Sequence, residues 1–432
     1  MSTDRNVFTE GYFEQNFVNG QWQFPKAPFE YEVRSPVHSA VLTQVPLSSQ
    51  LDVRAAASAA DRALPMWAAL DERTQFATRL VRALRQHSDR LIAQQSTEIG
   101  LTHSDSAALM RAALRFIEGV NVEGPKPACV EGHILGWGFP VLEWAVSIVP
   151  AVLRGATVVV KPSLRAPLTV AALVALMDEA GCPPGVVNLV QGQGRDVGSA
   201  MVGEDLISVC AVRGSAATIV SVAGTANRRG RQVRACSGAR QVLTVGPKAD
   251  PERIAAIVSR ALRANTAGGP LGLHHLRMHD EIASEFEATL IRELSGCFPA
   301  PVINDAFRRR ALGSITGALT EGARLITGGP SVPENRYHRM GWHMMPTVLG
   351  ITATYAARAV FFGGPTITLA TWSRASDLGM KSFDADSTLS SETTQANGTR
   401  DVQVSYNCGP ADALGAGLIG SGWLNSDNGA VQ

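Results

Sequence analysis

Thiols and imidazoles are the side chains of this chain that most readily do covalent or metal chemistry. The six cysteines are widely separated and form no Cys-x-x-Cys pair: Cys129, Cys182, Cys210, Cys236, Cys297 and Cys408. This spacing favours reduced thiols over a disulfide framework or a zinc site. His274, His275 and His279 are close in sequence. Because neighbouring residues on a strand point to opposite faces, we expect structural roles for them and no metal site.

The length and net charge of the chain limit the number of domains and the classes of partner to expect. With 432 residues, the chain exceeds one typical domain, so we expect two or three. A formal net charge of +1, without long charge runs, gives no electrostatic argument for a nucleic acid or membrane partner and favours a small molecule or another protein. The apolar region 139–160 is interrupted by Glu143, Pro150 and Arg154, which argues against a membrane span.

The N-terminal residues and the overall composition suggest a location. Met1-Ser-Thr-Asp-Arg5 lacks the basic-then-apolar pattern of a signal peptide, so we expect a soluble cytoplasmic protein. Arginine greatly outnumbers lysine, which hints at a bacterial source with a GC-rich genome.

Strand and helix patterns alternate along the first half of the chain. A hairpin with an Asn-Gly turn is expected at 17–22, followed by amphipathic helices at 51–69 and 73–100. Strands at 132–135, 156–160, 186–189 and 209–212 then alternate with helices at 142–153, 168–180 and 197–202. This order predicts a parallel sheet covered on both faces, which is a nucleotide-binding architecture. A second α/β unit is expected from 241–245 to 402–406, and the tail after Cys408 reads as loop or arm.

Several blocks closely resemble the cofactor half of the aldehyde dehydrogenase superfamily. They are Gly136-Trp-Gly-Phe-Pro140, in place of that family's Pro-Trp-Asn-Phe-Pro, then Gly155-Ala-Thr-Val-Val-Val-Lys-Pro-Ser163, Pro167-Leu-Thr169, Glu179-Ala-Gly-Cys-Pro-Pro-Gly-Val-Val-Asn188 and Gly192-Gln-Gly-Arg-Asp-Val-Gly198. The resemblance extends from Phe17 to Phe286, weakens beyond, and returns at Pro346-Thr-Val348 and Gly364-Pro365. Together these blocks are far more specific than a lone Gly-x-Gly motif.

The resemblance implies an aldehyde-dehydrogenase-like α/β fold with two main domains. A Rossmann-type cofactor domain with a parallel sheet would comprise residues 1–118 and 127–238, and a catalytic-type α/β domain residues 239–406. Residues 119–126 and 407–432 would form a shortened oligomerisation arm, because the family's longer connection and closing strand have no counterpart here. Short arms bury less surface between subunits, so a dimer is possible but not assured.

The family's oxidation chemistry lacks its usual residues in this sequence. In the family, a cysteine thiolate attacks the aldehyde, hydride passes to NAD(P)+, and a glutamate activates water. Here Pro270, in Asn265-Thr-Ala-Gly-Gly-Pro-Leu271, takes the nucleophile's place, and Cys236, in Ala235-Cys-Ser-Gly-Ala-Arg240, that of the base. Gly138 replaces the asparagine that holds the oxyanion. Since one such donor contributes ~2.7–4 kcal/mol to transition-state stabilisation, these changes remove the route to a thiohemiacetal.

Two residues of this region could still take part in catalysis or ligand binding. Cys236 could be a displaced nucleophile, or simply a small buried hydrophobic residue. Arg213 stands where the family has a threonine. Its guanidinium could hold a carboxylate or phosphate in the emptied pocket, or form an internal salt bridge that fills it.

The cofactor positions are better retained. Lys161 and Ser163 match an element that resembles a clamp on the adenosine ribose, with Leu164 in place of its acid. The following Arg165 could favour a 2′-phosphate, so NAD or NADP is possible. Ser215 follows Gly214 at the expected start of a helix, where free N–H groups can face a pyrophosphate. At the nicotinamide side, Phe361 replaces the family's glutamate, a ribose acceptor.

Three functions compete on this basis. The first is a redox-silent family member of bacterial metabolism, with specialised metabolism as one option, whose dismantled NAD(P)-dependent oxidation site is turned to ligand binding or a non-redox reaction. The second is an NAD(P)-dependent aldehyde dehydrogenase that uses Cys236. The third is a non-catalytic partner or scaffold of another enzyme.

Overall fold

The computed structural model describes residues 13–26, 29–70, 73–120, 128–237, 240–264, 273–331, 333, 335–352, 363–378, 387–394 and 400–405. Pro270, Phe361, Cys408 and most of the predicted oligomerisation arm lie outside these residues. The chain forms two compact units, which are described separately. The first unit holds residues up to Ser35 together with Ala40–Ser237, and the second holds Pro36–Ser39 together with the described residues from Arg240 onward.

The tetrapeptide Pro36–Ser39 groups with the second unit, although the sequence placed all of 1–118 in the first. Two hydrogen bonds explain this difference. The Trp342 N–H donates to the Pro36 carbonyl at 2.9 Å, and the Ser39 hydroxyl donates to the Met340 carbonyl at 2.5 Å.

The first unit is built on a seven-stranded sheet with the order β2-β1-β7-β6-β5-β8-β9. Its strands are β1 (Asn16–Val18), β2 (Gln21–Gln23), β5 (Val130–Ile134), β6 (Thr157–Lys161), β7 (Val187–Leu189), β8 (Val209–Gly214) and β9 (Gln232–Ser237). Strands β7, β6, β5, β8 and β9 run parallel, and β1 and β2 are antiparallel additions. A separate two-stranded ribbon pairs β3 (Glu30–Arg34) with β4 (Val41–Pro46).

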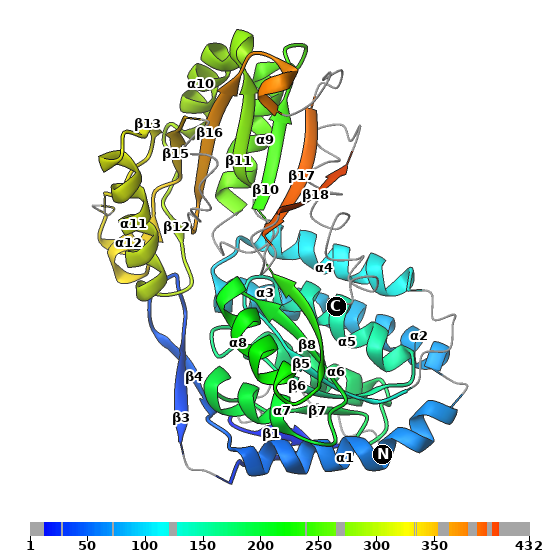
Figure 1. Ribbon diagram of the computed structural model, residues 1–432. Coiled ribbons are helices and arrows are strands. Elements are labelled where there is room, and N and C mark those ends of the chain that lie inside the picture. Colours follow the sequence, from blue (N-terminus) through cyan, green and yellow to red (C-terminus); the bar gives the residue numbers. More distant parts are fainter. Residues whose placement is uncertain are drawn as a thin grey trace. The chain divides into compact units, whose positions relative to one another are not determined.

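Helices cover both faces of this sheet (Figure 1). One face carries α5 (Pro140–Leu153) and α6 (Leu168–Glu179), with α2 (Arg73–Gln86), α3 (Ser88–Ile99) and α4 (His103–Glu118) packed against them. The other face carries α1 (Gln50–Ala69), α7 (Ser199–Gly203) and α8 (Ala216–Asn227). The central strands β5, β6 and β7 are buried throughout, as expected for parallel strands covered on both sides.

Local signals explain most of these boundaries. The predicted hairpin is confirmed: its turn residues Asn19 and Gly20 have φ values of 53° and 74°, which an Asn-Gly pair adopts readily. The predicted helix at 73–100 is instead two helices, because His87 leaves helical geometry with ψ of 11° and α3 begins afresh with Asp89 in its first turn. Helix α3 ends at Gly100, whose φ is 77°.

The second unit contains another seven-stranded mixed sheet, ordered β13-β15-β16-β11-β10-β17-β18. Its strands are β10 (Arg240–Val245), β11 (Leu273–His279), β13 (Arg324–Thr327), β15 (Thr347–Gly350), β16 (Thr366–Trp372), β17 (Ser387–Thr394) and β18 (Arg400–Ser405). The strands β15, β16, β11 and β10 are parallel. The predicted α/β unit between 241 and 406 is thereby confirmed.

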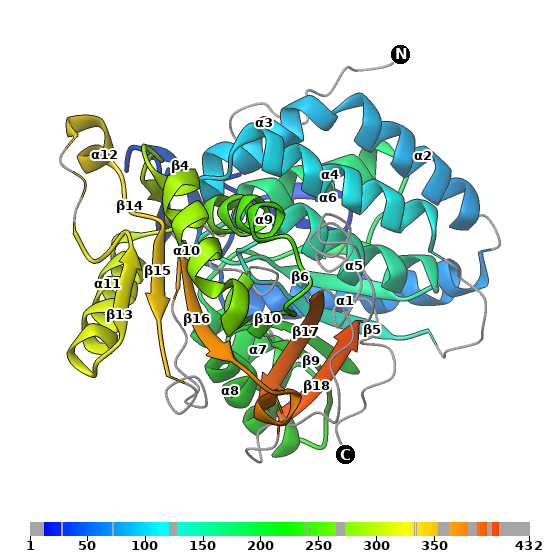
Figure 2. The same cartoon turned by 90° about the horizontal axis from the view of Figure 1, so that it is seen from above.

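Two helices pack side by side on this second sheet (Figure 2). They are α9 (Pro251–Ala264) and α10 (Asp280–Leu294), and their apolar residues form one core with β10, β11 and β16. The remaining elements are α11 (Asp305–Thr320), α12 (Arg336–Met340), the 3-10 helix η3 (Ala375–Leu378) and a short pair of β12 (Ala300–Pro301) with β14 (His343–Met344). Of the helices that the structure describes, none combines the length and apolar character that crossing a bilayer requires.

Candidate functional site

The carboxyl edge of the first sheet is where its topology favours a ligand. Chain order proceeds outward from β5 through β6 to β7, then returns to β8 on the other side of β5. In open parallel sheets, ligands bind outside the carboxyl ends of the strands where the order reverses in this way. The candidate site therefore lies around the ends of β6, β5 and β8, and five of the predicted cofactor and catalytic positions are found there.

Lys161 ends β6 and is almost fully buried, with 4% of its surface exposed. Its ammonium donates to the neutral carbonyl of Pro162 at 2.7 Å. Among the described residues, no carboxylate lies within ion-pair distance of it. Burial lowers the pKa of Lys161 to about 8, because the charged form loses hydration without gaining an anion. An anionic or oxygen-rich ligand at this strand end would stabilise the charge.

Ser163 and Arg165 follow Lys161 in the turn before α6. Both are half-buried, and the Arg165 N–H donates to the Ser163 hydroxyl at 3.3 Å. The Arg165 guanidinium lies 5.8 Å from the ring centroid of Trp137, in the loop after β5. Such stacking orients the guanidinium, a group whose fork of donors suits planar anions. The structure thus places a second cation beside the same sheet edge.

Ser215 lies after β8 and caps the N-terminus of α8. Its hydroxyl accepts a hydrogen bond from the Thr218 N–H at 3.3 Å, so the predicted helix start is confirmed. The side chain is exposed. The ends of β6 and β8 are separated by one strand, which at ~4.8 Å per strand puts Lys161 about 10 Å from Val212, its register neighbour on β8. Ser215 lies three residues beyond Val212.

Arg213 is the next-to-last residue of β8, near this edge of the sheet, and 6% of its surface is exposed. Its partner in strand register on β9 is Cys236, so the two predicted catalytic candidates are neighbours along adjacent parallel strands. Nothing is described of the Cys236 side chain, and Pro270 lies outside the described residues.

Glu143 is a member of this site that the sequence analysis noted only as an interruption of an apolar run. It lies in the first turn of α5, 2% exposed, and accepts the Gly136 N–H at 2.6 Å. Burial raises the pKa of Glu143 to about 7, although the nearby charge of Arg213 and the Gly136 hydrogen bond act to lower it. A buried carboxyl group and a buried guanidinium therefore lie near each other beside α5 and the strand ends.

Gly136 and Glu143 depend on each other. A Cβ atom at Gly136 would approach the Glu143 Oε1 atom to 2.8 Å, which is closer than real Cβ contacts. A proline there, as in the resembling motif, would also lack the N–H that Glu143 accepts. The glycine at 136 was thus a sequence signal for a buried acceptor nearby, but it could be interpreted only with the packing of α5 known.

Three of the described cysteines are poorly suited to nucleophilic chemistry. Cys182 and Cys210 are buried, and burial raises the pKa of both thiols, that of Cys210 to about 11. Burial and the charge of Glu131 raise the pKa of the half-buried Cys129 thiol as well. Because the thiolate is the reactive form, none of these three replaces the family's nucleophile.

The three histidines have structural contacts, as predicted. His274 Nδ1 accepts the Gln241 N–H at 3.3 Å, His275 Nδ1 lies 2.8 Å from the Thr368 hydroxyl, and His279 packs edge-on against Trp372. In the described part of the chain, no group of three or more His, Cys, Asp or Glu side chains is arranged to hold a metal ion.

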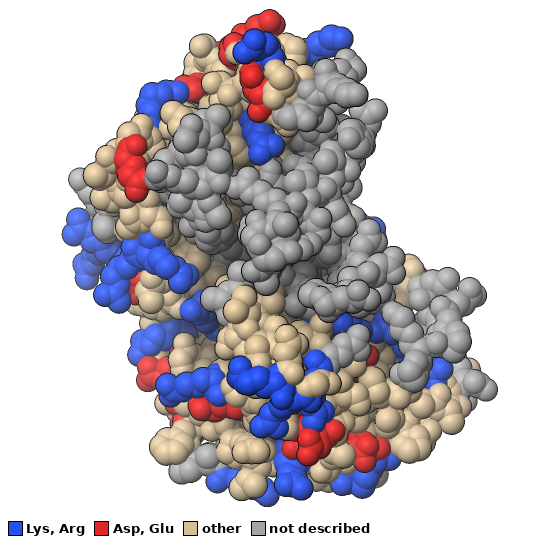
Figure 3. Space-filling model, viewed as in Figure 1, with Lys and Arg blue, Asp and Glu red and all other residues tan. Residues whose placement is uncertain are grey.

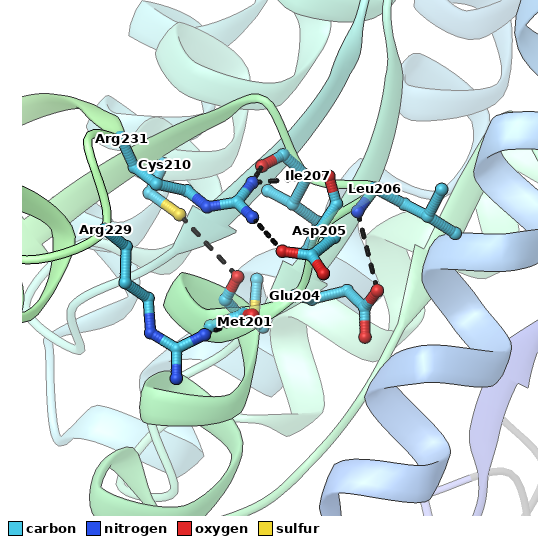
Figure 4. A network of polar contacts seen from close by, with 9 residues as sticks. Met201, Glu204, Asp205, Leu206, Ile207, Cys210, Arg229 and Arg231 are labelled. Carbon is cyan, nitrogen blue, oxygen red and sulfur yellow. Dashed lines mark hydrogen bonds and ion pairs between the residues drawn. The ribbon is translucent and has the colours of Figure 1, made fainter.

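The arginines between α8 and β9 stabilise the fold of the first unit. Arg229 donates to the Gly203 carbonyl at 2.8 Å, and Arg231 donates to the Ile207 carbonyl at 2.5 Å and pairs with Asp205 at 2.6 Å (Figure 4). These hydrogen bonds and this ion pair hold the segment before β8 against the start of β9. Over the described residues on the face in Figure 3, basic and acidic side chains are interspersed, which suits a small ligand better than a long polyanion.

The fold and the site define an α/β protein with two mixed sheets, whose first unit carries cations at the carboxyl edge of parallel strands. Residues 22–373 match the model described as the aldehyde dehydrogenase family. This chain therefore belongs to the aldehyde dehydrogenase family.

Relatives of known name are similar over most of the chain. Malonate-semialdehyde dehydrogenase from Bacillus cereus (strain G9842) is 27% identical over 364 residues, covering 76% of this chain and 74% of the relative. Alpha-ketoglutarate semialdehyde dehydrogenase from Haloferax volcanii is 27% identical over 365 residues, covering 77% and 76%. A crystal structure of aldehyde dehydrogenase C from Pseudomonas syringae, in complex with NAD+ and octanal, aligns with a TM-score of 0.78 at 25% identity, covering 85% and 82%.

Proposed function

We propose that this protein binds NADP+ or NAD+ at the carboxyl edge of its first sheet, holds an aldehyde-type ligand, and does not oxidise that ligand through the family's thiohemiacetal route. The observation that carries the cofactor part is the buried Lys161 ammonium, which has a neutral carbonyl as its hydrogen-bond partner and no carboxylate in ion-pair distance among the described residues. The named semialdehyde dehydrogenases and the octanal complex support an aldehyde or semialdehyde as ligand.

NADP+ is the better-matched dinucleotide. A ribose with two free hydroxyls is usually held by an acidic side chain, and Leu164 has none. Lys161 and Arg165 instead place two cations near one strand end, and a 2′-phosphate would be attracted by both. We expect NADP+ to bind at least about tenfold more tightly than NAD+, a difference of ~1.4 kcal/mol.

The absence of oxidation is supported by the residue types at the sites that resemble the family's catalytic positions. Pro270 offers no thiol, Gly138 offers no side-chain donor, and the thiols of Cys129, Cys182 and Cys210 are held in their protonated form. The buried Glu143 and Arg213 side chains add a further argument, since they occupy volume beside the ends of β5 and β8.

The relatives favour a second candidate more than they favour the first. They are named as dehydrogenases, so an NAD(P)-dependent aldehyde oxidation with Cys236 as displaced nucleophile is the direct transfer of their activity. The register pairing of Cys236 with Arg213 supports it, because it places Cys236 on the strand next to β8, near the candidate site.

Calorimetric titration with NADP+ and NAD+ tests the shared cofactor proposal. Lys161→Met should weaken NADP+ binding at least tenfold by removing the buried charge, whereas Lys248→Met removes an exposed lysine of the second unit and should leave it unchanged. Equal NADP+ affinity in the wild type and Lys161→Met would sink the proposal.

An assay of cofactor reduction distinguishes the redox-silent candidate from the dehydrogenase candidate. With NADP+ or NAD+ and a panel of semialdehydes and medium-chain aldehydes, the first candidate predicts no absorbance from reduced nicotinamide. The second predicts reduction that Cys236→Ala abolishes. If neither dinucleotide nor aldehyde binds, and the protein co-purifies with another enzyme, the remaining hypothesis of a non-catalytic partner takes precedence.

A further inference from the structure

A chain of four polar side chains crosses the first unit between β5, α5 and β9, on residues that the proposed function does not use. Glu131 and His133 are two residues apart on β5 and therefore point to the same face of the sheet. His133 Nδ1 lies 2.9 Å from the Ser147 hydroxyl of α5, and His133 Nε2 lies 3.1 Å from Glu131 Oε2. Arg234 of β9 forms an ion pair with the same Glu131 oxygen.

The acceptor and donor roles in this chain follow from chemistry. Burial acts to raise the pKa of Glu131, but the His133 hydrogen bond and the charges of Arg234 and Arg154 hold it below its ordinary value, so the carboxylate only accepts. The His133 proton therefore lies on Nε2. Burial, the largest effect on His133, lowers its pKa below the ordinary value, which leaves a neutral ring with an open Nδ1 lone pair. The Ser147 hydroxyl donates to that lone pair.

Ser147 is the most exposed member of this serine–histidine–glutamate group, although all three residues are buried. It retains 8% of its surface, against 6% for Glu131 and 1% for His133, and its helix neighbours Val146 and Pro150 are only half-buried. Ser106 on α4 provides a contrast. It is fully buried, and its hydroxyl exchanges hydrogen bonds with Gln95 and the Ile92 carbonyl instead of an imidazole.

We propose that Ser147 is an activated serine that takes an acyl group from small uncharged activated esters. The Ser147 oxygen attacks the ester carbonyl while its proton passes to His133 Nδ1, and the resulting imidazolium is stabilised by Glu131. As the C–O bond to the alcohol breaks, His133 returns the proton to the leaving alcohol, and Ser147 becomes an ester of the acyl group. Water attacks that ester by the same path in reverse, releasing the carboxylic acid and free Ser147.

The local charges suit this reaction. The nearby charge of Arg213 helps to hold the pKa of His133 below its ordinary value, which favours the neutral ring that accepts the Ser147 proton. The acyl donor should be small and uncharged, because Ser147 retains only 8% of its surface and the His133 and Glu131 side chains behind it are desolvated. The reaction needs neither a dinucleotide nor a thiol.

The test uses the full chain with para-nitrophenyl acetate, followed by intact mass and peptide mapping after short reaction times. The wild type should gain one acetyl group, on the peptide that contains Ser147. Ser147→Ala should lose this label, Ser106→Ala should keep it, and His133→Gln should acquire it at least about 100-fold more slowly, as expected for loss of a general base. Acetylation elsewhere only, or an unchanged rate in His133→Gln, would overturn the proposal.

A second measurement needs no variant and guards against a substitution that fails to fold. Nitrogen NMR of the histidine rings in the wild type should show His133 as neutral, with its proton on Nε2, at pH values around 7. A doubly protonated ring, or a proton on Nδ1, would leave Ser147 without an acceptor and would rule out the activated serine.

Discussion

Replacing Glu143 with glutamine should make the stability of the first unit less sensitive to pH. The ordinary pKa of 4.5 rises to about 7 in the folded protein because the carboxyl is buried. Between these values the folded state holds a proton that the unfolded state has released, so raising the pH favours unfolding. A shift of about 2.5 pKa units at ~1.4 kcal/mol each gives a loss of about 3 kcal/mol, complete above about pH 7.

Glu143→Gln should escape this loss while keeping an oxygen to accept the Gly136 N–H. The variant and the wild type should therefore unfold with similar free energies near pH 5, and the variant should be more stable by about 2 to 3 kcal/mol near pH 8. Glu98, whose pKa burial also raises to about 7, contributes the same slope to both proteins and cancels from the difference.

Urea unfolding followed by tryptophan fluorescence measures this difference, since Trp137 and Trp144 belong to the first unit. Glu118→Gln is the matched control: it removes an exposed carboxyl that pairs with Arg85, so the overall change in charge is the same. A Glu143→Gln advantage that stays constant from pH 5 to 8, or that grows toward low pH, would refute the account of Glu143 as a carboxyl held largely protonated by burial.

Three further outcomes follow from the same structure. Gly136→Ala should destabilise the first unit by about 1–3 kcal/mol in urea unfolding, because its Cβ would press on the Glu143 carboxyl, whereas Gly194→Ala has open space and should cost less. Lys161→Met should lower NADP+ affinity more than NAD+ affinity, which calorimetry resolves, since the 2′-phosphate loses its nearest buried cation. Cys210 should react with a thiol reagent at pH 7 only after urea is added, because burial raises the pKa of its thiol to about 11.

Much of the fold was predictable because each signal was local. Continuous apolar runs marked β6 and β7, and the Asn19-Gly20 pair marked the first turn. The alternation of apolar runs with helical patterns marked the parallel sheet. The break between α2 and α3 was missed because apolar spacing continues across His87, and a change in backbone geometry at one residue leaves no trace in that spacing.

The site was only partly predictable, for a physical reason. Lys161 and Ser215 could be placed because one ends a strand and the other begins a helix, and Ser163 follows Lys161 directly; parallel strands bring such positions to one edge. Glu143, and the group of Glu131, His133 and Ser147, depend on how α5 packs on β5. That packing brings together residues two to sixteen positions apart, and no pattern along the chain encodes it.

The most direct test of the proposed function is transfer of a labelled hydride. Wild-type protein, saturated with NADP+ as judged by calorimetry, is incubated with semialdehydes and medium-chain aldehydes that carry deuterium on the carbonyl carbon, and the recovered cofactor is analysed by mass spectrometry. We predict that the cofactor returns oxidised and free of deuterium. Deuterium on the nicotinamide ring, lost in Cys236→Ala, would contradict the redox-silent proposal and establish a dehydrogenase with a displaced thiol.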